Sequence, residues 1–187
     1  MNKSLLLLLA ALPALAACST ETRYEDPEAV ETIDARFGQT DLQVIAETMT
    51  QSFLQANVWG EGEKPTLLFG GVTNVTKQHV DTKNITDTIR TALVQSGKFR
   101  IVVGDQGLGE IQKEVDYQQS GAVDPTTAVE LGKQRGAEYV LYGRFSEIAK
   151  KKGDIHSRFM KFTLNAVNVQ TRELVWAEEK QISKITS

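Results

Sequence analysis

The sequence predicts one α/β domain in which a mixed sheet of about four to five strands is flanked by helices. Segments with apolar residues at helical spacing alternate with short runs typical of strands, in the order α-β-α-β-α-α-β-β-β. About 150 residues follow the N-terminal segments, a length that suits a single hydrophobic core. The chain has one cysteine, Cys18, so no intramolecular disulfide can form and burial must hold the domain together.

The first half of the domain predicts two helix–strand pairs. A helix is expected to begin near Thr40, where Thr40 and Gln43 can form a capping box. The short apolar run at 66–72 predicts a buried strand. A second helix is expected over 81–96, and a second strand over 99–103.

Two further helices are predicted before the C-terminal strands. The first is indicated by Leu108, Ile111 and Val115, which share one face at helical spacing. The second is expected to begin at Asp124-Pro125, because aspartate is a favoured N-cap and proline is favoured in the first turn.

The last third of the chain changes to strand patterns. Residues 138–148 predict a long apolar strand, and the charged residues 150–154 predict a turn. Apolar and polar residues alternate over 160–166, the pattern of a half-buried strand, and a change of phase at Val167 indicates a bulge or a strand covered on both faces. The last strand begins at Leu174, and the charged residues that follow suit an exposed edge.

The N-terminus has the order of a bacterial lipoprotein export signal. Lys3 precedes the apolar residues 5–12, and Leu15-Ala16-Ala17 stands directly before Cys18. The apolar segment is too short to span a bilayer as a helix. An ordinary signal peptide with a chance cysteine is the alternative, but a lone free thiol would be a liability in an oxidising compartment.

We therefore predict three parts: a lipoprotein signal peptide at 1–17, a lipidated N-terminus and flexible tether at 18–37, and a globular periplasmic domain at 38–187. Two or more acyl chains on Cys18 would hold the protein on a membrane. Ser19, rather than aspartate, follows the cysteine, which resembles lipoproteins that go to the outer membrane.

Composition and motifs argue against nucleic-acid binding and catalysis. Loss of residues 1–17 removes one basic residue, which leaves 20 basic against 24 acidic residues and a net charge of −4. His79 and His156 fall in predicted loops without partners at metal-ligand spacing. The glycine-rich stretch 104–109 lacks the third glycine of a dinucleotide motif. We expect no catalytic residue, metal, cofactor or small-molecule substrate.

Several segments, in order behind the lipoprotein signal, are shared with a known family. They are Pro65-Thr66-Leu67-Leu68-Phe69, the loop Thr73-Asn74-Val75-Thr76, and residues 89–99, 136–142 and 169–176. Together these segments resemble the LpoB family over about residues 40 to 180. The resemblance implies an outer-membrane lipoprotein that crosses the peptidoglycan mesh and docks on a small regulatory domain of a bifunctional, class A penicillin-binding protein. It further implies that the lipoprotein stimulates glycan polymerisation and peptide crosslinking without doing chemistry itself.

Two features depart from the family pattern. Family members can carry a long proline-rich tether, whereas the expected tether here is short and contains only Pro27. The last hairpin turn has Arg172 where glycine would be usual, at a position that favours positive φ, which would be consistent with a different turn type.

We predict partner contacts in the loop after the first strand and on the long apolar strand, from expected exposure rather than from a motif. The residues are Asn74, Lys77, His79, Tyr142 and Arg144. Arginine is enriched in interface hot spots, although an outward-facing residue on the solvent side of the sheet would also explain Arg144.

A structural or export-associated lipoprotein of the curli-secretion type is the alternative function. Those proteins carry long amphipathic hairpins, and the sequence shows no such pair of strands. An envelope enzyme is the third class.

Overall fold

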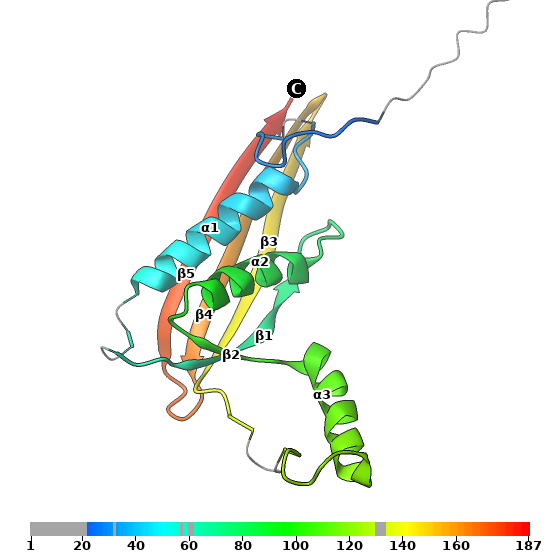
Figure 1. Ribbon diagram of the computed structural model, residues 1–187. Coiled ribbons are helices and arrows are strands. Elements are labelled where there is room, and N and C mark those ends of the chain that lie inside the picture. The colour runs from blue at the N-terminus through cyan, green and yellow to red at the C-terminus, as the bar shows by residue number, and fades with distance from the viewer. Residues whose placement is uncertain (1–21, 32, 57, 60–61, 130–133) are drawn as a thin grey trace, which may run out of the picture.

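A five-stranded mixed sheet forms the centre of the domain, with the strand order β2-β1-β3-β4-β5 (Figure 1). The structure is a computed structural model that describes residues 22–31, 33–56, 58–59, 62–129 and 134–187. Its strands are β1 (Thr66–Asn74), β2 (Arg100–Val102), β3 (Tyr139–Lys152), β4 (Ile155–Asn168) and β5 (Leu174–Thr186). β1 pairs with β2 and β3 in parallel, and β3, β4 and β5 form an antiparallel meander. The predicted fold class is confirmed.

Helices α1 (Gln39–Gln55) and α2 (Thr82–Gln95) cover the same face of the sheet, which we call the inner face (Figure 1). α1 lies against α2 and β5, and α2 also lies against β1. Their buried side chains join those of the strands in one core. Its fully buried large members are Ile45, Met49, Phe53, Leu67, Ile85, Ile89, Leu93, Leu141, Phe145, Met160, Phe162 and Leu164.

The opposite face of the sheet, which we call the outer face, is not covered by α1 or α2. Successive residues of β3 point to opposite faces. Leu141 and Phe145 are buried on the inner face, whereas Tyr142 and Arg144 are exposed on the outer face. Helix α3 (Asp105–Tyr117) extends from the end of β2, beyond the sheet (Figure 1).

The N-terminus of α1 differs from the prediction. The capping box of Thr40 and Gln43 does not form, because the N-cap is Gly38, two residues before Thr40. The N–H of Gly38 donates instead to the carboxylate of Asp41 at 2.9 Å. An acidic side chain in the first turn also interacts favourably with the helix dipole.

Two parts of the expected tether, residues 27–31 and 33–37, lie against the domain. The N–H of Glu31 donates to the hydroxyl of Thr40 at 2.8 Å. The ring of Phe37 packs edge-on against Phe145, with the two centroids 5.2 Å apart. Side chains of α1 and of the core therefore hold these parts of the expected tether against the domain.

The fourth helix predicted from Asp124 does not form in residues 124–129, which make turns. A short π-helical segment, η1 (Gln118–Ala122), follows α3 instead. The carboxylate of Asp124 accepts hydrogen bonds from the N–H and hydroxyl of Thr126 at 2.9 and 2.8 Å, so the capping contact exists. None of the residues 125–129 that follow it is buried, so this stretch has no packed face to support a helix. Residues 130–133 of the predicted helix lie outside the described residues.

The C-terminal hairpins correct the predicted charged turn, and the bulge near Val167 has its extra residue in β5 rather than in β4. β3 and β4 pair as far as Lys152 and Ile155, so the turn comprises only the two residues between them. Lys150 and Lys151 therefore belong to the strand. The register of β4 and β5 shifts after Ala166, where Val175 is the extra residue of the bulge.

Arg172 adopts the left-handed conformation in the β4–β5 turn, with φ of 63°, so the turn has the positive φ that glycine would supply. Its N–H donates to the carbonyl of Asn168 at 2.9 Å, which closes the turn. We expect Arg172→Gly to raise the free energy of unfolding by about 0.5 kcal/mol. The left-handed conformation costs an L-residue about 1 kcal/mol, and the greater conformational entropy of glycine in the unfolded chain offsets part of the gain.

Urea unfolding of the purified domain measures this change. Arg172→Val should destabilise the domain, since a β-branched residue is disfavoured at positive φ. Arg135→Gly, at a position without positive φ, serves as the matched control and should give no gain. A destabilised Arg172→Gly would contradict the interpretation.

Candidate functional site

The outer face presents two of the predicted contact residues side by side. Tyr142 lies opposite Asn165 on β4, and Arg144 lies opposite Thr163. Tyr142 exposes 46% of its surface, and Arg144 is also exposed. An exposed tyrosine and arginine on one rigid strand give a surface with the two residue types that are enriched in interface hot spots.

A groove of about 480 Å³ lies between β3 and β4 on this face. Arg144 and Lys161 supply two cationic groups, and Ile148 and Phe159 supply apolar surface. Ser146, Glu147 and Thr163 complete the lining. Lys161 also forms an ion pair with Glu179 of β5, with nitrogen and oxygen 3.5 Å apart. The groove therefore combines positive charge with an exposed apolar surface.

Sequence reasoning identified Arg144 but missed Lys161 and Phe159. The alternation over 160–166 placed Lys161 on the polar face of a strand, where nothing singles it out, and Phe159 lies before that range. Only the hairpin register brings Lys161 opposite Ser146, beside Arg144. A correct position for the β3–β4 turn would have supplied this signal.

The loop that follows β1 is shaped by the side chain of Asn74. Its amide nitrogen donates to the carbonyl of Gln78 at 3.0 Å, and its oxygen accepts from the N–H and hydroxyl of Thr76 at 2.9 and 2.8 Å. These hydrogen bonds engage the side-chain amide of Asn74 within the loop. Lys77 and His79, by contrast, are exposed.

The buried carboxylate of Glu147 attaches this loop to the sheet. Its side chain is only 3% exposed, and it accepts from the N–H of Lys77 at 2.8 Å and from the amide of Gln78 at 2.6 Å. The guanidinium of Arg158 donates to it at 3.0 Å. Burial raises the pKa of Glu147, but the three donors together outweigh burial and hold its pKa below the ordinary value.

The loop and the outer face adjoin each other. The N–H of Val75 donates to the carbonyl of Phe145 at 2.8 Å, so the loop leaves β1 alongside the part of β3 that carries Arg144. Tyr142 and Arg144 thus lie together on the outer face, and the exposed loop residues Lys77 and His79 lie at the edge of that face.

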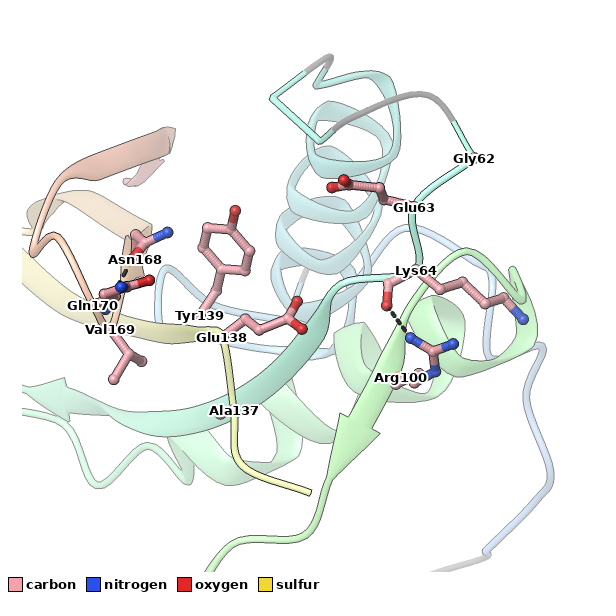
Figure 2. Close-up of a pocket in the computed structure, with 10 residues that line it drawn as sticks. All are labelled: Gly62, Glu63, Lys64, Arg100, Ala137, Glu138, Tyr139, Asn168, Val169 and Gln170. Carbon is pink, nitrogen blue, oxygen red and sulfur yellow. Dashed lines mark hydrogen bonds between the residues drawn. The ribbon is translucent and has the colours of Figure 1, made fainter. Parts of the chain in front are cut away.

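A larger hollow of about 700 Å³ lies at the other end of the sheet (Figure 2). Two of its charged groups bind the backbone: Arg100 donates to the carbonyl of Lys64 at 2.7 Å, and Glu138 accepts from the N–H of Thr66 at 3.1 Å. Figure 2 shows the side chain of Lys64 extending away from Glu138. These groups do not converge on one point, as a general acid and base would need to.

Within the described part of the chain, no three His, Cys, Asp or Glu side chains come together as a metal-binding group. Among the same residues, no helix is both long and apolar enough to cross a membrane. Residues 1–21, which include Cys18, lie outside the described residues.

The family model described as peptidoglycan-synthase activator LpoB matches residues 41–182, from the first turn of α1 into β5. This chain belongs to the LpoB family. The matched range includes the residues of the groove and of the loop after β1. The family resemblance seen in the sequence is confirmed.

Relatives named penicillin-binding protein activator LpoB support the assignment. The protein of Enterobacter sp. (strain 638) is 26% identical over 160 residues, which cover 86% of this chain and 69% of the relative. The protein of Dickeya dadantii is 30% identical over 112 residues, 59% of this chain and 53% of the relative. The chain thus matches about half to two thirds of the length of these relatives. The solved LpoB C-terminal domain from Escherichia coli aligns with a TM-score of 0.44 and 21% identity over 75% of this chain and 98% of that one.

Replacement of Glu147 by glutamine tests the attachment of the loop. We expect Glu147→Gln to lower the free energy of unfolding by about 2 kcal/mol at neutral pH, because hydrogen bonds to a charged group are lost in a buried position. The folded-state pKa lies below the ordinary value of 4.5, so the carboxylate stabilises the fold above that value and loses this effect as the pH falls through the folded-state pKa.

Chemical unfolding at several pH values measures both effects. The difference between the wild type and Glu147→Gln should be constant near neutral pH and shrink on acidification. Glu110→Gln, which removes one member of an ion pair whose side chains are 74% and 77% exposed, is the control and should leave stability unchanged. A pH-independent difference would argue against the charge of Glu147 as the cause.

Proposed function

We propose that this protein is an outer-membrane lipoprotein that binds the regulatory domain of a class A penicillin-binding protein and activates it allosterically. The observation that carries the proposal is the family match over residues 41–182, in a family described as activators of peptidoglycan synthase. In this proposal the protein acts by contact, and the partner does all of the chemistry.

The outer face and the adjoining loop form the proposed docking surface. Tyr142 and Arg144 contact the partner directly, together with Lys77 and His79 of the loop, while Asn74 contributes by holding the loop in shape. A groove with positive charge favours an acidic surface on the partner. A micromolar complex corresponds to about −8 kcal/mol and needs a buried area on the order of 1,000 Å².

Activation requires more than binding. A ligand shifts a two-state equilibrium only by its differential affinity for the two states. The proposed surface therefore binds the active conformation of the synthase more tightly than the inactive one. β3 and β4 suit this role, because a rigid paired surface discriminates between shapes better than a mobile one.

The proposed anchor is a lipid on Cys18, after removal of residues 1–17. Pro27 already contacts the domain, because its carbonyl accepts from the amide of Gln43, and nine residues, 18–26, lie between the proposed lipid and this contact. Nine residues extend to at most about 30 Å. Anchoring raises the local concentration of the protein only if the tether spans the gap, so this proposal requires a partner that reaches toward the outer membrane.

The anchor is tested by mass spectrometry of the mature protein. We expect the polypeptide to begin at Cys18 and to carry the added mass of a diacylglycerol group and an N-terminal acyl chain. Cys18→Ser should move the protein from the membrane fraction to the soluble fraction, because two or more acyl chains are needed for stable attachment. An unmodified thiol on the membrane-bound wild type would refute lipidation.

The docking surface is tested with alanine substitutions in the Cys18→Ser protein. Tyr142→Ala and Arg144→Ala should each raise the Kd for a class A penicillin-binding protein by about tenfold or more, the effect expected of hot-spot residues. Lys161→Ala should weaken binding less and reduce its salt dependence.

Biolayer interferometry gives the Kd, and a glycan-polymerisation assay gives the stimulation. Lys98→Ala, an exposed lysine before β2 and away from the groove, is the matched control and should bind like the wild type. Full affinity and full stimulation by a Tyr142→Ala/Arg144→Ala double variant would exclude this face as the docking surface.

A further inference from the structure

The far end of the β3–β4 hairpin projects beyond β1. β1 pairs with β3 only as far as Phe145, whereas β3 and β4 stay paired up to Lys152 and Ile155. β5 accompanies β4 to the same end, where Thr186 lies opposite His156. The N-terminal segment leaves the domain at this end, as Figure 1 shows. The hairpin tip is therefore a three-stranded ribbon that stands clear of the parallel strands.

Two exposed isoleucines lie on the outer face of this ribbon. Ile155 leaves 44% of its surface exposed, and Ile185 leaves 72% exposed. Ile155 lies opposite Lys152, and Ser157, which lies opposite Lys150, also lies opposite Ile185. Residues directly opposite each other point to the same face, and Lys150 and Lys152 continue the outer-face series of β3. We call Lys150, Lys152, Ile155 and Ile185 the tip patch.

The tip carries a positive charge that its acidic neighbours do not neutralise. The three consecutive lysines 150–152 are exposed, and the turn that follows them contributes one acidic residue, Asp154. The buried carboxylates of Asp41 and Glu147 are already held in ion pairs. The acidic segment 27–31 lies against α1, the helix that covers the inner face. The outer side of the tip therefore combines exposed apolar side chains with positive charge.

The position of the tether indicates what the tip patch meets. The lipid anchor of the proposed function, on which this inference rests, is separated from the first domain contact at Pro27 only by residues 18–26, which extend to at most about 30 Å. Because the N-terminal segment leaves beside the tip, the tip is held close to the lipid. Lysines are attracted to anionic phospholipids, and apolar side chains bury themselves at the boundary between headgroups and acyl chains.

We propose that the tip patch binds the surface of an anionic phospholipid membrane. Ile155 and Ile185 enter the boundary between headgroups and acyl chains, while Lys150 and Lys152 extend their ammonium groups to the lipid phosphates. The tip patch thereby fixes the orientation of a domain that the anchor alone would leave free to turn. Arg144 lies about 26 Å from Lys152 along β3, so the groove at Arg144 stays open while the tip is bound.

Co-sedimentation with vesicles tests the inference in the full mature chain with Cys18→Ser, which carries no lipid. The chain should bind vesicles of phosphatidylcholine mixed with phosphatidylglycerol more tightly than vesicles of phosphatidylcholine alone, and added salt should weaken this binding. Lys150→Glu with Lys152→Glu should lower the partition coefficient by about twenty-fold or more, since each lysine near an anionic surface contributes about fivefold.

Lys64→Glu with Lys98→Glu is the matched control, because it changes the net charge equally through two exposed lysines at the other end of the sheet. It should lower binding by less than about twofold, since distant charges are screened. Equal losses in the two double variants, or no preference for the anionic vesicles, would overturn the proposal. Sedimentation with isolated peptidoglycan but not with vesicles would overturn it as well, because the lysines would then bind the wall polymer.

A polarity-sensitive fluorophore on a single introduced cysteine tests the apolar contact. In the chain with Cys18→Ser, the label on Ile155→Cys should shift its emission to the blue when anionic vesicles are added. The same label on Val169→Cys, which is 51% exposed and follows β4 at the opposite end of the sheet, should not shift. No shift at position 155, or equal shifts at both positions, would contradict insertion of the tip. Neither measurement involves a lipid on Cys18 or a penicillin-binding protein, so failure here is distinguishable from failure of the proposed function.

Discussion

The alternation of side chains along β3 is the constraint on which the two faces of the domain depend. β3 is the central strand, and it pairs with β1 on one side and β4 on the other. Leu141 and Phe145 anchor the core, and Gly143 between them has no room for a side chain, since a Cβ there would collide with the carbonyl of Thr163. A slip of one residue would turn Tyr142 and Arg144 into the core and expose Phe145. The same packing that stabilises the inner face therefore fixes the groove on the outer face.

At the edge of the apolar core, buried charged side chains hold neighbouring segments of the chain together. Beside the Glu147 cluster, the carboxylate of Asp41 accepts from the ammonium of Lys184 at 2.7 Å, and the side chain of Asp41 is only 3% exposed. Lys184 also donates to the carbonyl of Arg36 at 2.9 Å. This pair joins the start of α1 to the end of β5 and holds the preceding segment. Because a buried charge without its partner is costly, such contacts fix one arrangement of the loop and the N-terminal segment.

The sequence could predict those features that depend on local periodicity. The three long C-terminal strands and the alternation of the first three helices with β1 and β2 follow from patterns within a few residues. Features that depend on distant pairs could not be read in this way. The amide of Gln78 reaches Glu147, 69 residues further along the chain, and no local pattern marks that pair. Thr40 shows the same limit, because its hydroxyl suits a helix cap but binds the N–H of Glu31 instead.

The docked N-terminal segment also sets how the domain would face a membrane. Figure 1 shows this segment leaving the domain at the end where the C-terminus and the tip of the β3–β4 hairpin lie. With the proposed lipid on Cys18 and about 30 Å of free tether, that end must stay close to the membrane. The strands then point away from the membrane, with the exposed Lys150, Lys151 and Lys152 nearest to the lipid and α3 farthest from it. A partner that approaches the proposed docking surface from the wall side would therefore meet α3 before it reaches the groove at Arg144.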